Sequence, residues 1–291
     1  MLSAGLLYSL LTGVCWSLIA VILSCSARSK KLDIVSYSLL QSALVAAACF
    51  FCFSSPGKME FNSGFYMLCL IILSAAVLNA FAQYLVKRSM SGGHYAPVWA
   101  LAQAALIFPY LFGVILWGNK INGVNIAGIL FLLAGILLPC RRSFTTPGSW
   151  LKTALMAFVL YGILQCLYLL PSHLKELTDP GAMRPVLVSF GLITGWGIIA
   201  LTRREKLQFN RTIIWAAVIM AVFHTISLKT FFLALDAFGK IGLDGIGMPL
   251  MQGINLAVFG LYTLIVLREK RTPENLISEL LIPSGLLCLC L

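Results

Sequence analysis

Polar side chains occur at intervals inside the long apolar stretches of this chain, where they are costly and therefore informative. In lipid, such side chains face the interior of a helical bundle or a water-filled cavity. Most of them are amides and aromatic residues, whose chemistry is hydrogen bonding and stacking. Each amide can equally join two helices by a hydrogen bond, but as a set they predict a binding cavity. The candidate lining residues are Trp16, Asn79, Gln83, Trp99, Gln103, Tyr161, Gln165, His224, Lys229, Gln252 and Asn255.

Spacing supports a shared cavity. Asn79 and Gln83 are four residues apart and lie on one helix face, as do Tyr161 and Gln165. Tyr168 follows three residues after Gln165, and Gln41 adds a further amide in an earlier apolar segment.

His224 and Lys229 are the ionisable candidates, and each has two interpretations. Lys229 either faces the cavity, where it attracts an anionic group or titrates in proton coupling, or extends to the interface and pairs with Asp236. Asp244 is a second candidate partner. His224 either accepts a coupled proton or makes a structural hydrogen bond. The expected spans hold no carboxylate near their middles, so exchange or uniport without protons remains an alternative.

Composition identifies the elements that must carry these residues. The chain has 291 residues, of which 60% are hydrophobic and 11% charged, whereas soluble domains have about 25% charged residues. Backbone groups in hydrocarbon must be paired locally, so the spans are expected to be helices. The first is expected to be retained, since no basic residue precedes it. The ten expected spans are Ser3–Cys25, Ile34–Phe53, Phe65–Val86, Ala96–Trp117, Val124–Pro139, Trp150–Leu170, Pro185–Leu201, Thr212–Leu235, Ile246–Leu267 and Leu276–Leu291.

The basic residues indicate orientation. Fifteen of the 21 Lys and Arg residues follow odd-numbered spans, and such loops face the cytoplasm. We therefore expect a multi-pass protein of the cytoplasmic (inner) membrane with both termini outside. The charge of +11 is explained by topology, so no nucleic-acid partner is expected.

The last third of each half repeats one pattern. An apolar run, a polar turn and a second apolar run extend from Trp99 to Leu138 and recur after Gly253. Asn119 and Glu269 are 150 positions apart, as are Gly135 and Gly285. Five spans per half is an odd number, so the copies, residues 1–148 and 149–291, are expected to enter the membrane from opposite sides.

Two five-helix copies, each with a short polar turn before its last helix and a Gly-Leu-Leu-like close, resemble the drug/metabolite transporter superfamily, and its EamA-like ten-helix members in particular. The Leu267-Arg268-Glu269-Lys270 turn and the stretches AFAQYLVKR (80–88) and FLALDAFG (232–239) carry this resemblance. It implies a secondary carrier, commonly an exporter, with a central cavity lined by both halves.

We therefore expect a secondary-active transporter, an exporter, of a small organic metabolite or amino acid. The alternative is a non-transporting integral membrane protein, either an enzyme or an assembly subunit. Nine scattered cysteines and no recurring Ser/His/Asp group predict no catalytic site, cofactor or metal. The expected partners are the small-molecule substrate, the lipid bilayer and, as a candidate coupling ion, the proton, with the chain a monomer or homodimer.

Overall fold

The computed structural model describes residues 2–28, 32–55, 61–92, 94–118, 122–138, 141, 148–177, 182–204, 206–268 and 273–290. All regular secondary structure in these ranges is helical. Eight helices are long and apolar enough to cross a membrane, and two further apolar helices, Gly123–Leu137 and Leu280–Leu289, are shorter. The expectation of an all-helical, multi-pass membrane protein is confirmed. The turn residues Asn119 and Glu269 lie outside the described ranges.

The helices follow the expected spans closely. The first half contains α1 (Leu2–Arg28), α2 (Ile34–Phe53), α3 (Ser63–Met90), α4 (Tyr95–Gln103), the 3₁₀ turn η2 (Ala104–Leu106), α5 (Ile107–Trp117) and α6 (Gly123–Leu137). The second half contains α8 (Ser149–His173), the 3₁₀ turn η4 (Lys175–Leu177), α9 (Arg184–Arg203), α10 (Arg211–Gly239), α11 (Asp244–Ile265) and α12 (Pro273–Cys290). The expected fourth span is therefore interrupted, because η2 separates α4 from α5.

Local sequence explains where several helices begin and end. The side chains of Asp33, Asn62 and Asn210 each accept a hydrogen bond from the backbone N–H three residues later, at the starts of α2, α3 and α10. Gly118 ends α5 in the left-handed region at φ 62°, which glycine adopts without strain.

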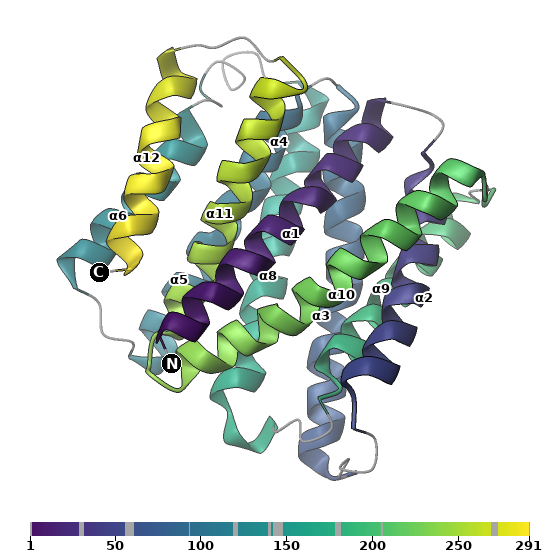
Figure 1. The fold of residues 1–291 in the computed structure, drawn as a ribbon, viewed down its shortest axis with the longest axis horizontal. Coiled ribbons are helices and arrows are strands. Elements are labelled where there is room, and N and C mark those ends of the chain that lie inside the picture. Colours follow the sequence, from purple (N-terminus) through teal and green to yellow (C-terminus); the bar gives the residue numbers. More distant parts are fainter. Residues whose placement is uncertain are drawn as a thin grey trace.

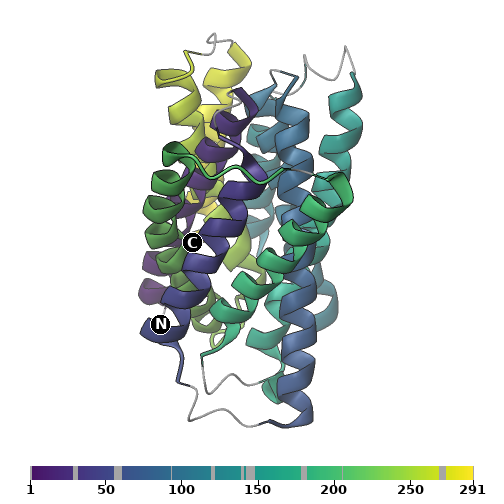
Figure 2. The same ribbon diagram turned by 90° about the vertical axis from the view of Figure 1, so that its right-hand side faces the viewer.

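The helices form one bundle in which consecutive passes run in opposite directions (Figure 1). The chain begins and finishes at the same end of the bundle, and α6 and α12 pack together at one edge (Figure 1). α1 packs along α10 and α11, α3 packs along α8 and α9, and α2 packs against α9 and α10 (Figure 2). Large apolar side chains such as Phe51 (83% exposed) and Leu201 (80% exposed) cover the outside, as expected of a surface that faces lipid.

Candidate functional site

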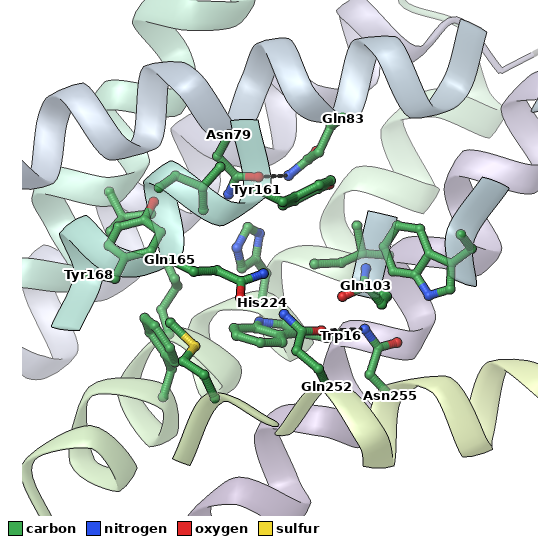
Figure 3. Close-up of a pocket in the computed structure, with 17 residues that line it drawn as sticks. Trp16, Asn79, Gln83, Gln103, Tyr161, Gln165, Tyr168, His224, Gln252 and Asn255 are labelled. Carbon is green, nitrogen blue, oxygen red and sulfur yellow. Dashed lines mark hydrogen bonds between the residues drawn. The ribbon is translucent and has the colours of Figure 1, made fainter. Parts of the chain in front are cut away.

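A cavity lies in the middle of the bundle, and several helices contribute one stripe of side chains to it (Figure 3). α8 contributes positions 161, 164, 165 and 168, α10 contributes 224, 228 and 231, and α11 contributes 248, 252 and 255. Positions three, four and seven residues apart share one helix face. α3 and α4 add Asn79 with Gln83 and Trp99 with Gln103, again four residues apart, and α1 adds Trp16 with Ile19.

Ten of the eleven sequence-predicted residues line this cavity: Trp16, Asn79, Gln83, Trp99, Gln103, Tyr161, Gln165, His224, Gln252 and Asn255. They come from six helices that are far apart in the sequence. The polar and aromatic residues within the apolar segments therefore indicate which face of each of these helices lines the cavity.

Lys229 is the exception, because the structure places it outside the lining of the cavity. It follows His224 by five residues, which turns it about 140° around α10, away from the cavity face. Its Nζ lies 5.3 Å from the centre of the Phe53 ring, in a cation–π contact with the end of α2. The side chain is half-buried and is not among the lining residues.

The proposed pairing of Lys229 with Asp236 is also wrong, since Asp236 pairs with Arg184. The Arg184 guanidinium donates two parallel hydrogen bonds to the Asp236 carboxylate, at 2.9 and 2.5 Å. Ser172 Oγ donates to the same carboxylate at 2.8 Å. This network ties the end of α8, the start of α9 and the last turn of α10 together.

An aromatic cluster separates the cavity from that network. Tyr168 and Phe231 line the cavity with their ring centres 5.6 Å apart, and Trp16 lies 5.2 Å from Phe231. Phe232 packs on both Tyr168 and Phe231, and the Arg184 guanidinium lies 4.8 Å from its ring centre. The cavity is therefore covered at this end by aromatic rings and then by an ion pair.

Hydrogen bonding inside the cavity is incomplete. Gln83 Nε2 donates to Asn79 Oδ1 at 3.1 Å, and Asn255 Nδ2 donates to Gln252 Oε1 at 3.3 Å. The lining also holds buried polar atoms that have no hydrogen-bond partner among the described residues: Trp99 Nε1, Gln103 Oε1, Asn255 Oδ1 and both amide atoms of Gln165. Buried polar groups in native proteins are nearly always paired, so these atoms mark where a solute or water would bind.

Figure 3 shows the Gln165 amide extending from α8 into the space that the labelled side chains surround. Gln165 is only 2% exposed, yet neither its oxygen nor its nitrogen is paired within the protein. An amide that joined two helices would be bonded across them. Among the described residues, the Gln165 amide therefore makes no hydrogen bond that joins two helices.

The other side of the cavity leads past His224 to a second, smaller cavity. Gln41 Nε2 donates to His224 Nδ1 at 2.7 Å, and His224, Gln83 and Ile19 line both spaces. The second cavity also touches Tyr37 and Ser42, near the start of α2. Polar groups thus continue from the central cavity toward the end of the bundle where α1 finishes.

Size and charge limit what the central cavity can hold in this conformation. The space open to the centres of water-sized spheres is about 70 Å³, which is room for several waters or a small solute. Its described lining contains no Asp, Glu, Lys or Arg, and His224 is its one imidazole. The lining therefore offers hydrogen-bonding groups and aromatic faces.

Sequence reasoning did not select the apolar part of the lining, which comprises Ile19, Leu164, Val188, Leu228, Phe231 and Met248. Nothing distinguishes such residues from ordinary core, except that Leu164 lies between Tyr161 and Gln165 on one helix face and Leu228 follows His224 by four. The sequence shows Gln41 as an amide within an apolar segment. It does not show the hydrogen bond to His224, because that bond joins positions 183 residues apart.

Comparison with known proteins identifies the fold and no more. No family model matches this chain, and no curated protein matches it. Among the solved structures that match is a crystal structure of a protein with a TM-score of 0.70 and 15% sequence identity. The match covers 98% of this chain and 96% of that chain. At that identity the likeness establishes a shared arrangement of helices over nearly the whole length of both chains.

Proposed function

We propose that the protein is a secondary-active transporter which carries a small, hydrogen-bonding organic solute, such as a metabolite or an amino acid, across the cytoplasmic membrane. The observation that carries the proposal is the cavity at the centre of a membrane bundle, with buried amide atoms that lack protein partners. A protein that only stabilises an assembly gains nothing from unpaired polar groups, which cost about 1–3 kcal/mol each.

Paired helix contacts support a duplicated, inverted arrangement of residues 1–148 and 149–291. If α1, α2, α3 and α4–α5 correspond to α8, α9, α10 and α11, the main contacts between the two halves have counterparts. α1 packs on α10 as α8 packs on α3, and α2 packs on α10 as α9 packs on α3. α1 also packs on α11 as α8 packs on α4 and α5. Inverted repeats of this kind are the basis of many secondary carriers.

Two further observations agree with duplication. Gly118 and Arg268, 150 positions apart, both have left-handed backbone at φ 62° and 52°. Three corresponding pairs of helices also supply nearly all of the lining: α1 with α8, α3 with α10, and α4 with α11. The solute would therefore bind between the two copies, and tilting one copy against the other would alternate its access. With α6 and α12 as the remaining pair, this gives ten passes.

The distribution of basic residues indicates how the protein is oriented in the membrane. The ends of α1, α3, α9 and α11 carry Arg28, Lys87, Arg88, Arg203, Arg204 and Arg268, and the positive-inside rule puts that end in the cytoplasm. Both termini are then outside, and so is the Arg184–Asp236 network. In this conformation the rings and the ion pair would close the outer side of the cavity, and we propose export as the direction on the resemblance to the EamA-like drug/metabolite transporters.

The 3₁₀ turn in the fourth pass is a candidate hinge beside the cavity. A 3₁₀ turn within a helix often marks a hinge, and η2 begins directly after Gln103, which lines the cavity. A change at η2 would move Trp99 and Gln103 relative to α5.

Counterflow in proteoliposomes tests the proposal. Vesicles with purified protein are loaded with a pooled metabolite extract, and uptake of labelled amino acids and small neutral metabolites is measured at two pH values. We expect exchange of at least one solute, lost in Gln165→Leu and kept in Gln208→Leu, whose residue is exposed outside the helices. Failure of the folded wild type to exchange any solute would contradict the proposal and favour a non-transporting role.

A further inference from the structure

One hydrogen bond connects the second helix to the ionisable residue of the cavity. Gln41 lies in α2 and His224 in α10, and both are 6% exposed. Their side chains meet at 2.7 Å through Gln41 Nε2 and His224 Nδ1. Gln41 lines the second cavity but not the central one. It therefore contacts the imidazole from the side of the second cavity.

The direction of this bond determines where the imidazole carries its proton. In this structure the Gln41 amide presents its N–H₂ group to Nδ1, and because such a group only donates, Nδ1 accepts with its lone pair. A neutral imidazole with an unprotonated Nδ1 carries its hydrogen on Nε2. Nε2 makes no hydrogen bond among the described residues, and His224 belongs to the wall of the central cavity.

We propose that Gln41 is a positioning residue, which holds His224 as the neutral Nε2–H tautomer and so makes it an uncharged hydrogen-bond donor to the solute. The inference rests on the proposed carrier function and specifies its recognition chemistry. The cavity lining also offers two acceptors without a hydrogen-bond partner among the described residues, Gln103 Oε1 and Asn255 Oδ1. A matching solute is small, with an oxygen acceptor for His224 and a hydroxyl or N–H donor for the amides.

Nitrogen NMR tests the tautomer without any solute. The full chain, labelled with ¹⁵N-histidine and held in lipid nanodiscs at pH 7, has three histidines, and the His224→Gln spectrum identifies the signals of His224. We expect an unprotonated Nδ1 and a protonated Nε2. In Gln41→Leu both signals should move toward the average of two exchanging tautomers. A protonated Nδ1 in the wild type, or a spectrum that Gln41→Leu leaves unchanged, would overturn the inference.

Counterflow tests the consequence for binding. Gln41→Leu should raise the KM of the exchanged solute about three- to tenfold and change kcat less. Ser38→Ala is the matched control, because Ser38 is also buried in α2 but lines neither cavity. In a His224→Leu background, Gln41→Leu should have no further effect on KM, since its influence passes through the imidazole. Additive losses would instead assign Gln41 a separate role.

The two measurements separate this inference from the function on which it rests. The expected NMR spectrum without any exchange would contradict the carrier and leave the tautomer assignment standing. Exchange accompanied by a protonated Nδ1 would support the carrier and contradict the role given to Gln41.

Discussion

Buried glutamine side chains in this protein differ in whether they form hydrogen bonds, and this difference indicates their roles. Gln165 is buried with its whole amide unpaired, whereas Gln41 is equally deep and bonded across two helices. We therefore propose a binding role for Gln165 and a positioning role for Gln41. Hydropathy cannot separate these roles, because both amides lie in apolar segments.

Replacing Gln165 separates a binding role from a structural one. Gln165→Leu removes two unpaired buried groups and keeps the volume, so thermal stability should be unchanged or higher. Solute exchange should fall at least tenfold, because the amide is a cavity ligand. Melting temperature and counterflow measured on one preparation check both effects, with Gln208→Leu as the exposed control. A large loss of stability would indicate a structural amide.

Lys229 is expected to matter little for transport. Its ammonium packs on Phe53 outside the cavity, and exposed cation–π contacts contribute about 0.5–1 kcal/mol. Lys229→Met should therefore keep near wild-type counterflow, while His224→Leu should raise the KM of the exchanged solute. Loss of exchange in Lys229→Met at normal expression would restore the earlier interpretation of Lys229 as a solute-binding cation.

The helices are held in register by contacts between residues of different helices. α8, α9 and α10 meet at the Arg184–Asp236–Ser172 network, and α3 meets α9 where small residues allow close approach. A Cβ added to Gly191 would lie 2.5 Å from Ala76 Cβ, and one added to Gly195 would lie 2.6 Å from Ala80 Cβ. Small residues four apart on both helices are a common way to pack membrane helices.

Breaking the ion pair should loosen one end of the bundle. Arg184→Gln leaves the Asp236 carboxylate without its bidentate partner, and hydrogen bonds to charged groups contribute about 1.5–3 kcal/mol. A lower melting temperature is expected, with Arg211→Gln, an exposed Arg at the start of α10, as the neutral control. If the two residues act together, adding Asp236→Asn should cost much less than it does alone.

The glycines of α9 offer a matched pair of substitutions. Gly191→Ala puts a methyl group into the α3 backbone and Ala76, and overpacking of this kind costs about 1–3 kcal/mol. Gly197→Ala meets nothing within 4 Å and should be neutral or stabilising by up to about 1 kcal/mol, since alanine favours helix. Size-exclusion profiles after heating measure both. Equal melting temperatures would contradict the close α3–α9 packing.

At the scale of the molecule, the proposed inversion has a direct consequence for access. Ser91 and Lys240 follow the corresponding helices α3 and α10 and are both exposed. In a cysteine-free background, Ser91→Cys and Lys240→Cys should react with an impermeant thiol reagent from opposite sides of the membrane, Lys240→Cys from outside. Labelling of both from one side would contradict the inverted repeat, and labelling of Ser91→Cys alone from outside would reverse the assigned orientation.

The sequence alone determined the helical class, nearly all helix positions and ten of the cavity residues. The length of an apolar segment, a helix N-cap such as Asp33 and the four-residue spacing of polar side chains are local properties. Each can be recognised within one segment of the sequence. Tertiary structure decided the rest: that Asp236 bonds Arg184 rather than Lys229, that Gln41 holds His224, and that η2 interrupts the fourth pass. These contacts depend on how helices rotate and cross, and residues such as Gln41 and His224, which are 183 positions apart, meet only once the bundle is packed.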